Sequence, residues 1–150
     1  MYGRGVNGRP ARTPAAQRLV VDVQPEASQV AVARHAVTDF LRAHDVPSVV
    51  VEDMQLVTSE LVTNAVRHGR DGNVVVTVLS DEVVELTVSN VGPVEGIPPV
   101  EEWGPAPPTS SSGRGLGIVR RLSDHVEVIE VGDRTVVACR RRLPDRGGAS

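Results

Sequence analysis

The segment TSELVTNAVRHG, from Thr58 to Gly69, is the most informative stretch of the sequence. It continues a helical pattern in which apolar residues recur every three or four positions. Residues four apart lie on one side of a helix, so Glu60 and Asn64 share the border of the apolar stripe. A carboxylate can accept a proton from a hydroxyl group or water, and an amide oxygen is a hard ligand that suits Mg²⁺. The pair predicts an edge for a metal and a phosphate, although ordinary solvated polar residues produce the same pattern.

The helix that contains this segment is expected to span Ser48–Arg67. Ser48 can cap its start, and Glu52 and Asp53 near the first turn favour the positive end of the helix dipole. We interpret His68, at the other end, as a partner of the dipole rather than as a ligand. The residues expected to be buried are Val50, Met54, Val57, Leu61 and Ala65.

The remaining elements follow from periodicity and from turn residues. A strand is expected over Arg18–Val23, followed by a helix within residues 25–47 whose apolar stripe is Val30, Ala33, Val37, Leu41 and His44. Strands are expected over residues 73–79 and 81–90, a short helix over 115–124, and a hairpin over 126–141. This order predicts an α+β fold, a two-layer sandwich with helices on one face of a mixed, mainly antiparallel sheet.

Composition excludes several classes of function. The net charge is −3 at pH 7, and the whole aromatic set is Tyr2, Phe40 and Trp103, so a base-stacking nucleic-acid platform is not expected. All 16 basic residues are Arg, which excludes a phosphate-binding Lys and a Lys Schiff base. Cys139 is the single cysteine and is expected to be buried in a strand. With no apolar run long enough for a membrane span, we expect a cytoplasmic protein.

Two tails and one long loop are expected outside the regular elements. Residues 1–16 hold Gly, Pro and three Arg without an acid and are expected to form a disordered basic tail, and residues 144–150 a loose end. The stretch from about 93 to 112 is rich in Gly, Pro and Ser, which is typical of a functional lid. Its Trp103 is expected either to contact a partner or to pack under that lid.

Glycines after the lid suggest a phosphate-binding segment. In SGRGLGIVRRL, Gly113, Gly115 and Gly117 alternate directly before an apolar helical run. Glycines let backbone N–H groups approach an anion, and a helix start adds oriented donors. Arg114 can supply the cation that the absence of Lys removes, although the same run also suits a flexible hinge. Asn90, where a strand meets a turn at Gly92, can read the edge of a planar ligand or simply favour the turn.

Taken in order, these segments resemble the GHKL (Bergerat) ATP-binding family, which includes histidine-kinase ATPase domains, gyrase B and Hsp90. ELVTNAVRHG looks like the N box, NVGPV stands at the D-x-G-x-G box, GRGLG looks like the final glycine box, and DRTVVACRR is similar to the closing strand. The resemblance spans roughly Arg18 to Leu143 and implies a histidine-kinase-like ATPase domain over residues 17–143. By size it is closest to bacterial anti-sigma factor serine-protein kinases.

The resemblance also implies roles for individual residues. Glu60 would be the general base, and Asn64 would hold the Mg²⁺ that bridges the phosphates of ATP. Asn90 and Gly92 stand in the adenine-reading box, and Thr135 would support it from the closing strand. The box that binds phosphate and anchors the lid comprises Gly113, Arg114, Gly115, Leu116 and Gly117.

One position departs from the family pattern, because Asn90 stands where the family has an adenine-reading Asp. An amide oxygen still accepts a hydrogen bond from the adenine amino group, but it lacks the charge assistance that strengthens such bonds. The expected cost is about 1–2 kcal/mol, which weakens ATP binding roughly tenfold. The second glycine of this box is replaced by Val94, unless Gly96 takes its place.

The implied function is that of a Mg-ATP-dependent protein serine/threonine kinase and anti-sigma factor. Its implied partners are a small anti-sigma factor antagonist, which it phosphorylates, and a sigma factor, which it sequesters; a homodimer is possible, and no membrane or nucleic-acid contact is expected. The alternative is a catalytically weak or inactive partner-binding module of the same fold with altered nucleotide recognition. An ATPase that drives conformational change would need further domains to use the motion.

Overall fold

The computed structural model describes residues 16–68, 71–92, 97, 99–104 and 111–144, and the side chains of residues 111–114 lie outside this description. The expected tails, residues 93–96 and most of the expected lid therefore fall outside the described residues. No helix in the described ranges is long and apolar enough to cross a membrane.

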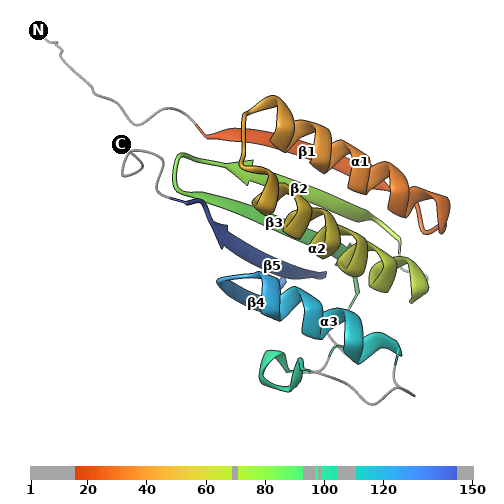
Figure 1. Ribbon diagram of the computed structural model, residues 1–150. Coiled ribbons are helices and arrows are strands. Elements are labelled where there is room, and N and C mark those ends of the chain that lie inside the picture. The colour runs from red at the N-terminus through yellow and green to blue at the C-terminus, as the bar shows by residue number, and fades with distance from the viewer. Residues whose placement is uncertain (1–15, 69–70, 93–96, 98, 105–110, 145–150) are drawn as a thin grey trace, which may run out of the picture.

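Three helices cover one face of a five-stranded sheet (Figure 1). The helices are α1 (Ser28–Ala43), α2 (Ser48–Arg67) and α3 (Ser111–Leu122), with a short 3₁₀ helix η1 (Val100–Glu102) before α3. The strands are β1 (Gln17–Val23), β2 (Asn73–Leu79), β3 (Val83–Val91), β4 (His125–Val131) and β5 (Arg134–Arg142). Their order across the sheet is β1-β2-β3-β5-β4. The predicted two-layer α+β architecture is confirmed.

Every pairing among the described strands is antiparallel. The sheet is thus fully antiparallel in this part of the chain, rather than mixed. The two hairpins, β2–β3 and β4–β5, form where turn residues predicted them. Gly132 has φ of +61° in the two-residue loop between β4 and β5, a conformation that glycine adopts without steric cost.

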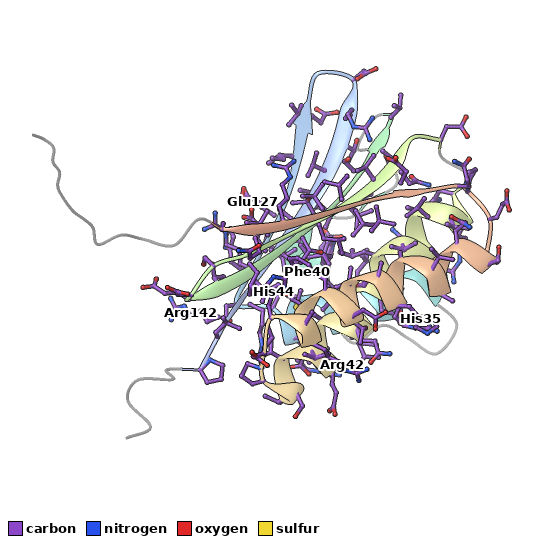
Figure 2. All side chains as sticks on the ribbon, turned by 90° about the horizontal axis from the view of Figure 1, so that it is seen from above. His35, Phe40, Arg42, His44, Glu127 and Arg142 are labelled. Carbon is purple, nitrogen blue, oxygen red and sulfur yellow. The ribbon has the colours of Figure 1, made fainter. Side chains whose placement is uncertain are left out.

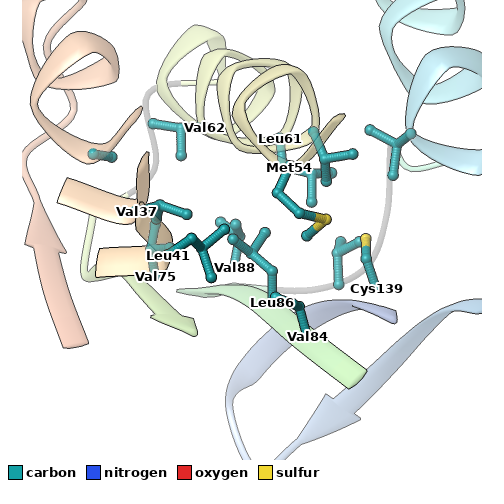
Figure 3. Packing of buried hydrophobic residues seen from close by; sticks show 14 of the residues in the cluster. Val37, Leu41, Met54, Leu61, Val62, Val75, Val84, Leu86, Val88 and Cys139 are labelled. Atoms are coloured by element: carbon teal, nitrogen blue, oxygen red, sulfur yellow. The ribbon is translucent and has the colours of Figure 1, made fainter. Parts of the chain in front are cut away.

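The core lies between the helices and the helix-facing side of the sheet (Figure 3). Burial alternates along β2 and β3, because successive side chains of a strand point to opposite faces. Val75, Leu86 and Val88 meet the fully buried Met54 of α2 and Leu41 of α1 in one cluster. Aliphatic packing of this kind, with few aromatic residues, supplies the main stabilisation of the domain.

Helix α2 has the predicted bounds, and all five residues predicted for its buried stripe are buried. The predicted cap is wrong. Pro47 occupies the N-cap position without a side-chain hydrogen bond, and its fixed φ of −55° suits the start of a helix, so exposed Ser48 is already helical. Glu52 and Asp53 lie beyond the first turn. Asp53 instead pairs with Arg141 of β5 at 2.9 Å and joins α2 to the sheet.

Helix α1 buries three of the residues predicted for its stripe, Ala33, Val37 and Leu41. His44 belongs to the end of the helix instead, as its C-cap residue. Its Nδ1 lies 2.9 Å from the carbonyl oxygen of Phe40, and the two rings are 4.7 Å apart (Figure 2). The histidine therefore completes the last turn of α1.

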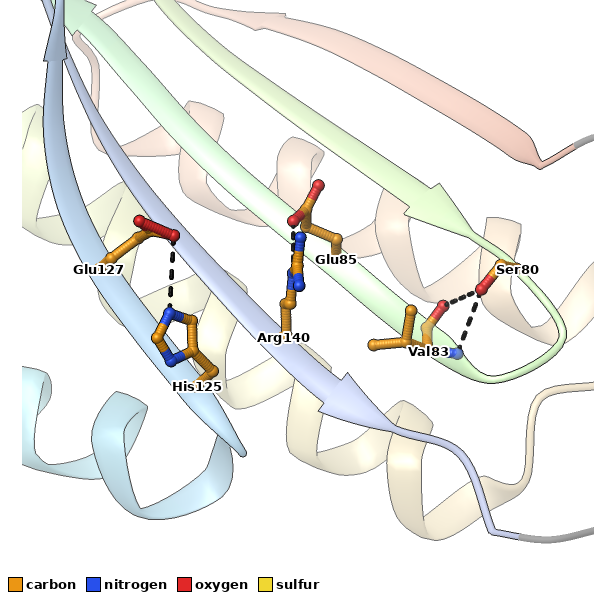
Figure 4. Close-up of polar contacts among 6 residues, drawn as sticks. All are labelled: Ser80, Val83, Glu85, His125, Glu127 and Arg140. Atoms are coloured by element: carbon orange, nitrogen blue, oxygen red, sulfur yellow. Dashed lines mark hydrogen bonds and ion pairs between the residues drawn. The ribbon is translucent and has the colours of Figure 1, made fainter.

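The face of the sheet opposite the helices carries polar pairs (Figure 4). Arg140 of β5 binds Glu85 of β3 at 2.8 Å, and His125 lies 3.5 Å from Glu127 along β4. The Glu85 carboxylate raises the pKa of Arg140. These side chains are largely exposed, so they add little stability.

Cys139 is buried on the helix-facing side of β5, as predicted. Desolvation by burial raises the pKa of its thiol to about 12. The folded protein therefore holds the thiol proton at pH values where an unfolded chain releases it, and the contribution of this group to stability falls as the pH rises above about 9.

We expect the Cys139 thiol to resist thiol-specific reagents at pH 8 in the folded protein, because the thiolate is the reactive form. Absorbance after addition of a disulfide reagent should show no rapid release, while the same sample in denaturant should react fully. Rapid stoichiometric reaction of the native protein would contradict the buried position.

We expect Leu41→Ala to lower the free energy of unfolding by about 2–5 kcal/mol, because it opens a cavity in the fully packed core. Leu56→Ala, on a side chain of α2 that is 49% exposed, is the matched control and should change it by less than about 0.5 kcal/mol. Urea unfolding followed by circular dichroism measures both, and equal effects would argue against this core.

Candidate functional site

A small cavity lies between the last turns of α2 and the ends of β3 and β5. Its volume is about 20 Å³, which is room for about one water molecule. Two predicted site residues, Asn64 of α2 and Asn90 of β3, line it together. The complete lining is Leu61, Asn64, Ala65, His68, Val88, Asn90, Ile97 and Val137. The structure thus brings together two amides that are 26 residues apart in the sequence.

Glu60 lies one helical turn before Asn64 and faces α3. A Cβ atom built on Gly115 would collide with Oε1 of Glu60, so the carboxylate rests directly on the backbone of α3. The predicted general base and the predicted glycine box are therefore in contact. Glu60 is half-buried, which leaves part of its carboxylate open to solvent.

Gly117 fixes the other side of α3. A Cβ atom built there would lie 2.6 Å from the carbonyl oxygen of Gly104, so this helix packs directly against the loop backbone. Arg120 strengthens the contact, because its Nη1 donates to the carbonyl oxygens of Glu101 (3.0 Å) and Trp103 (3.2 Å). Residues 101–104 are thus fastened to α3.

Trp103 is 2% exposed and belongs to the hydrophobic core. Of the two positions expected for it, packing beneath the loop is confirmed, and a surface contact with a partner is wrong for this conformation.

Hydrogen bonds with Thr135 at the start of β5 and with the neighbouring Asp133 fix the turn that follows β3. Asn90 and Thr135 are directly paired across the two strands, and both are buried. Thr135 Oγ1 donates to the carbonyl oxygen of Gly92 at 2.6 Å, and the N–H of Gly92 donates to the carbonyl oxygen of Asp133 at 2.8 Å. Gly92 has φ of +134°, which side-chain-bearing residues rarely adopt. Thr135 therefore positions the backbone beside Asn90.

The glycine run does not precede α3, as predicted, but lies within its first half. Helix α3 begins at Ser111, and the backbone of Gly113, Arg114 and Gly115 is already helical. The first four N–H groups of a helix have no partner inside the helix and can bind an anion. Because α3 begins at Ser111, these N–H groups belong to residues 111–114 and not to the residues after the glycine run. The side chain of Leu116 is 2% exposed and packs in the core, so it is not available to a ligand.

A larger hollow of about 270 Å³ lies at the connection between α1 and α2. Its lining is Arg42, Asp45, Val46, Ser48, Val51 and Glu52. None of the predicted site residues belongs to it, and both signs of charge line it. The smaller cavity is therefore the better candidate, because predicted chemistry and geometry coincide there.

Several residues at the site were not predicted as part of it. Ile97 lines the cavity from the loop, and the backbone of Gly104 packs against α3 at Gly117. Arg120 of α3 donates a hydrogen bond to the loop carbonyl of Glu101. His68 is the C-cap residue of α2, consistent with its predicted helix-end position, but it also lines the cavity. Ile97 is a single apolar residue in a Pro-rich loop, so no periodicity in the sequence indicates its position. Arg120 lies in GIVRRL, whose two arginines indicate the basic end of a helix.

Gly117→Ala and Gly115→Ala form a matched pair of tests. Either substitution favours the helix by about 1 kcal/mol. At Gly117 the new methyl group meets backbone, so we expect a net loss of roughly 1–2 kcal/mol from overpacking.

At Gly115 the methyl group meets the end of a flexible side chain, so stability should be unchanged or slightly higher while Glu60 moves. Thermal unfolding compares the two variants. A lower melting temperature for Gly115→Ala than for Gly117→Ala would overturn this assignment of contacts.

Comparison with known proteins identifies the family of this domain. Residues 23–141 match the family model described as the histidine kinase-like ATPase domain. An anti-sigma F factor from Geobacillus kaustophilus (strain HTA426) is 34% identical over 122 residues, which cover 74% of this chain and 82% of that protein. An anti-sigma F factor from Geobacillus stearothermophilus is 35% identical over 116 residues, 70% of this chain and 78% of that protein.

Two solved structures share the fold at low sequence identity. The crystal structure of the RsbU and RsbW domains of a Mycobacterium tuberculosis protein superposes with a TM-score of 0.64 at 20% identity, covering 85% of this chain and 32% of that one. The SiaB–SiaC complex from Pseudomonas aeruginosa gives a TM-score of 0.55 at 16% identity, covering 83% and 89%. With a family model that spans most of its length and relatives above 30% identity, the chain belongs to the histidine kinase-like ATPase domain family.

Proposed function

We propose that this protein is a Mg-ATP-binding anti-sigma factor and serine-protein kinase, which phosphorylates a small anti-sigma factor antagonist and sequesters a sigma factor. One observation carries the proposal. The Glu60 carboxylate rests on Gly115 of α3, one turn from an amide, Asn64, that shares a cavity with Asn90. These contacts support a site in which an acid, a metal-suited amide and the backbone of α3 act on one ligand.

The residues present fit Mg-ATP. Asn64 offers an amide oxygen, a ligand type that Mg²⁺ accepts, and would hold the ion together with the nucleotide. The cavity has apolar walls and a buried amide, which suits a planar base. Its volume of about 20 Å³ has room for about one water molecule, so a base requires the cavity to widen.

Each residue has a distinct part in the proposed reaction. Glu60 orients the serine hydroxyl of the antagonist and accepts its proton. Asn64 would hold Mg²⁺, and the N–H groups at the start of α3, with Arg114, would receive phosphate charge. Asn90 meets the base, and Thr135 keeps the Gly92 turn in place beside it. When bound, Mg-ATP would supply the phosphoryl group for the serine oxygen, with ADP as the leaving group.

The partners in this proposal are inferred from the names of the similar proteins. Two similar proteins are named anti-sigma F factor, and the resemblance of the sequence motifs implies the same class. The partners to test are therefore a sigma factor and a serine-bearing antagonist. The proposed location is the cytoplasm, and the proposed assembly is a homodimer.

A second candidate function is partner binding without phosphate transfer. Asn90 in place of a carboxylate, together with the small volume of the cavity, favours weak nucleotide binding. Under this alternative, the same fold holds a partner while ATP is dispensable. The two candidates differ in one measurable property, the phosphorylation of the antagonist.

We expect Glu60→Gln to bind Mg-ATP like the wild type but to transfer phosphate at least about 100-fold more slowly, because the amide cannot accept the serine proton. Radiolabelled phosphate transfer to a purified antagonist measures the rate, and a thermal shift with Mg-ATP reports binding. Glu52→Gln, on the exposed side of the same helix, is the matched control and should keep full activity.

Asn64→Ala should lose the part of the thermal shift that depends on Mg²⁺ and keep its fold. Unaltered transfer by Glu60→Gln would remove Glu60 from the mechanism. If the wild type binds Mg-ATP and transfers nothing to any antagonist, the binding-only function stands.

A further inference from the structure

Strand β1 forms one free edge of the sheet. All of its residues pair with β2 along one side, and no strand among the described residues pairs with its other side (Figure 1). An unpaired edge presents a row of backbone N–H and C=O groups that another strand can bind. Native proteins commonly protect such an edge with charged side chains, so the side chains of β1 indicate whether this edge is blocked or available.

Three exposed side chains of β1 point to the face of the sheet opposite the helices. Arg18, Val20 and Asp22 alternate with Leu19 and Val21, which pack against the core. Val20 is 52% exposed although it is apolar. Neither Arg18 nor Asp22 forms an ion pair with another described residue. The edge therefore carries an exposed valine with one free charge of each sign, placed two residues before it and two residues after it.

This arrangement is symmetric about Val20. When two β1 strands pair antiparallel with Val20 opposite Val20, Arg18 of each copy lies opposite Asp22 of the other, on the same face. On the helix-facing side, the same register places Leu19 opposite Val21. A shift by two residues puts a charge opposite Val20, and a shift by one residue exchanges the two faces of one strand. The side chains of β1 thus favour one register, which is that of a two-fold axis.

The pairing of β1 with β2 extends this register into the sheet. Val20 lies opposite Val76 of β2, so valines of both strands would continue from one copy into the other. Aliphatic pairs and pairs of opposite charge are the cross-strand contacts that stabilise a sheet. The other edge strand, β4, carries Glu127 and Glu130 but no arginine. No register of two β4 strands pairs a carboxylate with an arginine, so β4 has the charges of a protected edge and β1 does not.

We propose that β1 is the contact surface of a homodimer, in which two copies pair their β1 strands antiparallel around Val20 and form one continuous sheet. The occupant of the edge is therefore a second copy of this chain, whose Asp22 and Arg18 neutralise Arg18 and Asp22 of the first. Main-chain hydrogen bonds hold such an added strand, and the side chains set its register. This inference rests on the homodimer of the proposed function and names the surface that forms it, but it does not depend on the nucleotide site.

Charge reversal tests the register. Arg18→Asp and Asp22→Arg each replace two attractive pairs of the dimer by two repulsive ones, so each should weaken dimerisation at least about tenfold. The double variant Arg18→Asp/Asp22→Arg restores opposite charges in both pairs and should dimerise within about threefold of the wild type. Sedimentation equilibrium of the full chain over a range of concentrations gives the dissociation constants. Glu130→Arg reverses an exposed acid on the other edge strand and, as the matched control, should leave the constant unchanged.

Val20→Cys tests the two-fold axis, because a residue on the axis lies opposite its own copy. Directly opposite Cα atoms of an antiparallel pair are about 4.5–5.5 Å apart, which suits a disulfide bond. Mild oxidation should link most of this variant into covalent dimers, and the buried Cys139 should not compete. Leu56→Cys, at a side chain of α2 with similar exposure, is the matched control and should stay unlinked.

Different outcomes contradict different parts of the proposal. A dimer that resists both single charge reversals, or equal linkage in Val20→Cys and Leu56→Cys, would overturn the inference and assign the homodimer to another surface. A wild type that stays monomeric up to about 100 μM would overturn the inference and the proposed homodimer together. Phosphate transfer to an antagonist is measured separately and would stand or fall by itself. Circular dichroism establishes whether each variant folds; if a charge variant does not, Val20→Cys decides.

Discussion

The close approach of α3 to the rest of the molecule is the constraint on which the candidate site depends. Gly115 and Gly117 have no side chains, so one side of this helix reaches the Glu60 carboxylate and the opposite side reaches the backbone at Gly104. A larger residue at Gly117 would hold α3 away from the loop backbone, and one at Gly115 would displace the Glu60 carboxylate. The glycines therefore act through packing as much as through backbone freedom, and they bring α2, α3 and the loop to a common point.

Much of this arrangement could be predicted from the sequence, because its strongest signals are local. The apolar spacing in α2 gave the correct bounds and the correct buried stripe. The valine-rich segments gave strands, and Gly132 gave the turn between two of them. Glu60 and Asn64 were identifiable because a four-residue spacing on a helix fixes their relation without knowledge of the fold.

The remaining features depend on contacts between distant segments, which no local pattern encodes. The position of Ile97 in the cavity and the attachment of Arg120 to the loop follow from tertiary packing alone. The start of α3 was placed too late, because glycine has low helix propensity, and packing against α2 and the loop overrides it. Pro47 replaced the expected serine cap for a similar reason, since its backbone geometry already suits a helix start.

The strand order has a consequence for how the chain folds. The centre of the sheet pairs β3 with β5, and the residue pair Val91–Arg134 encloses the whole loop and α3. Closing so long a segment costs more chain entropy than forming the β2–β3 or β4–β5 hairpin or the α1–α2 pair. We expect these local units to form early and the β3–β5 seam late. The Asn90–Thr135 pair lies in that seam, so the site would be completed among the last steps of folding.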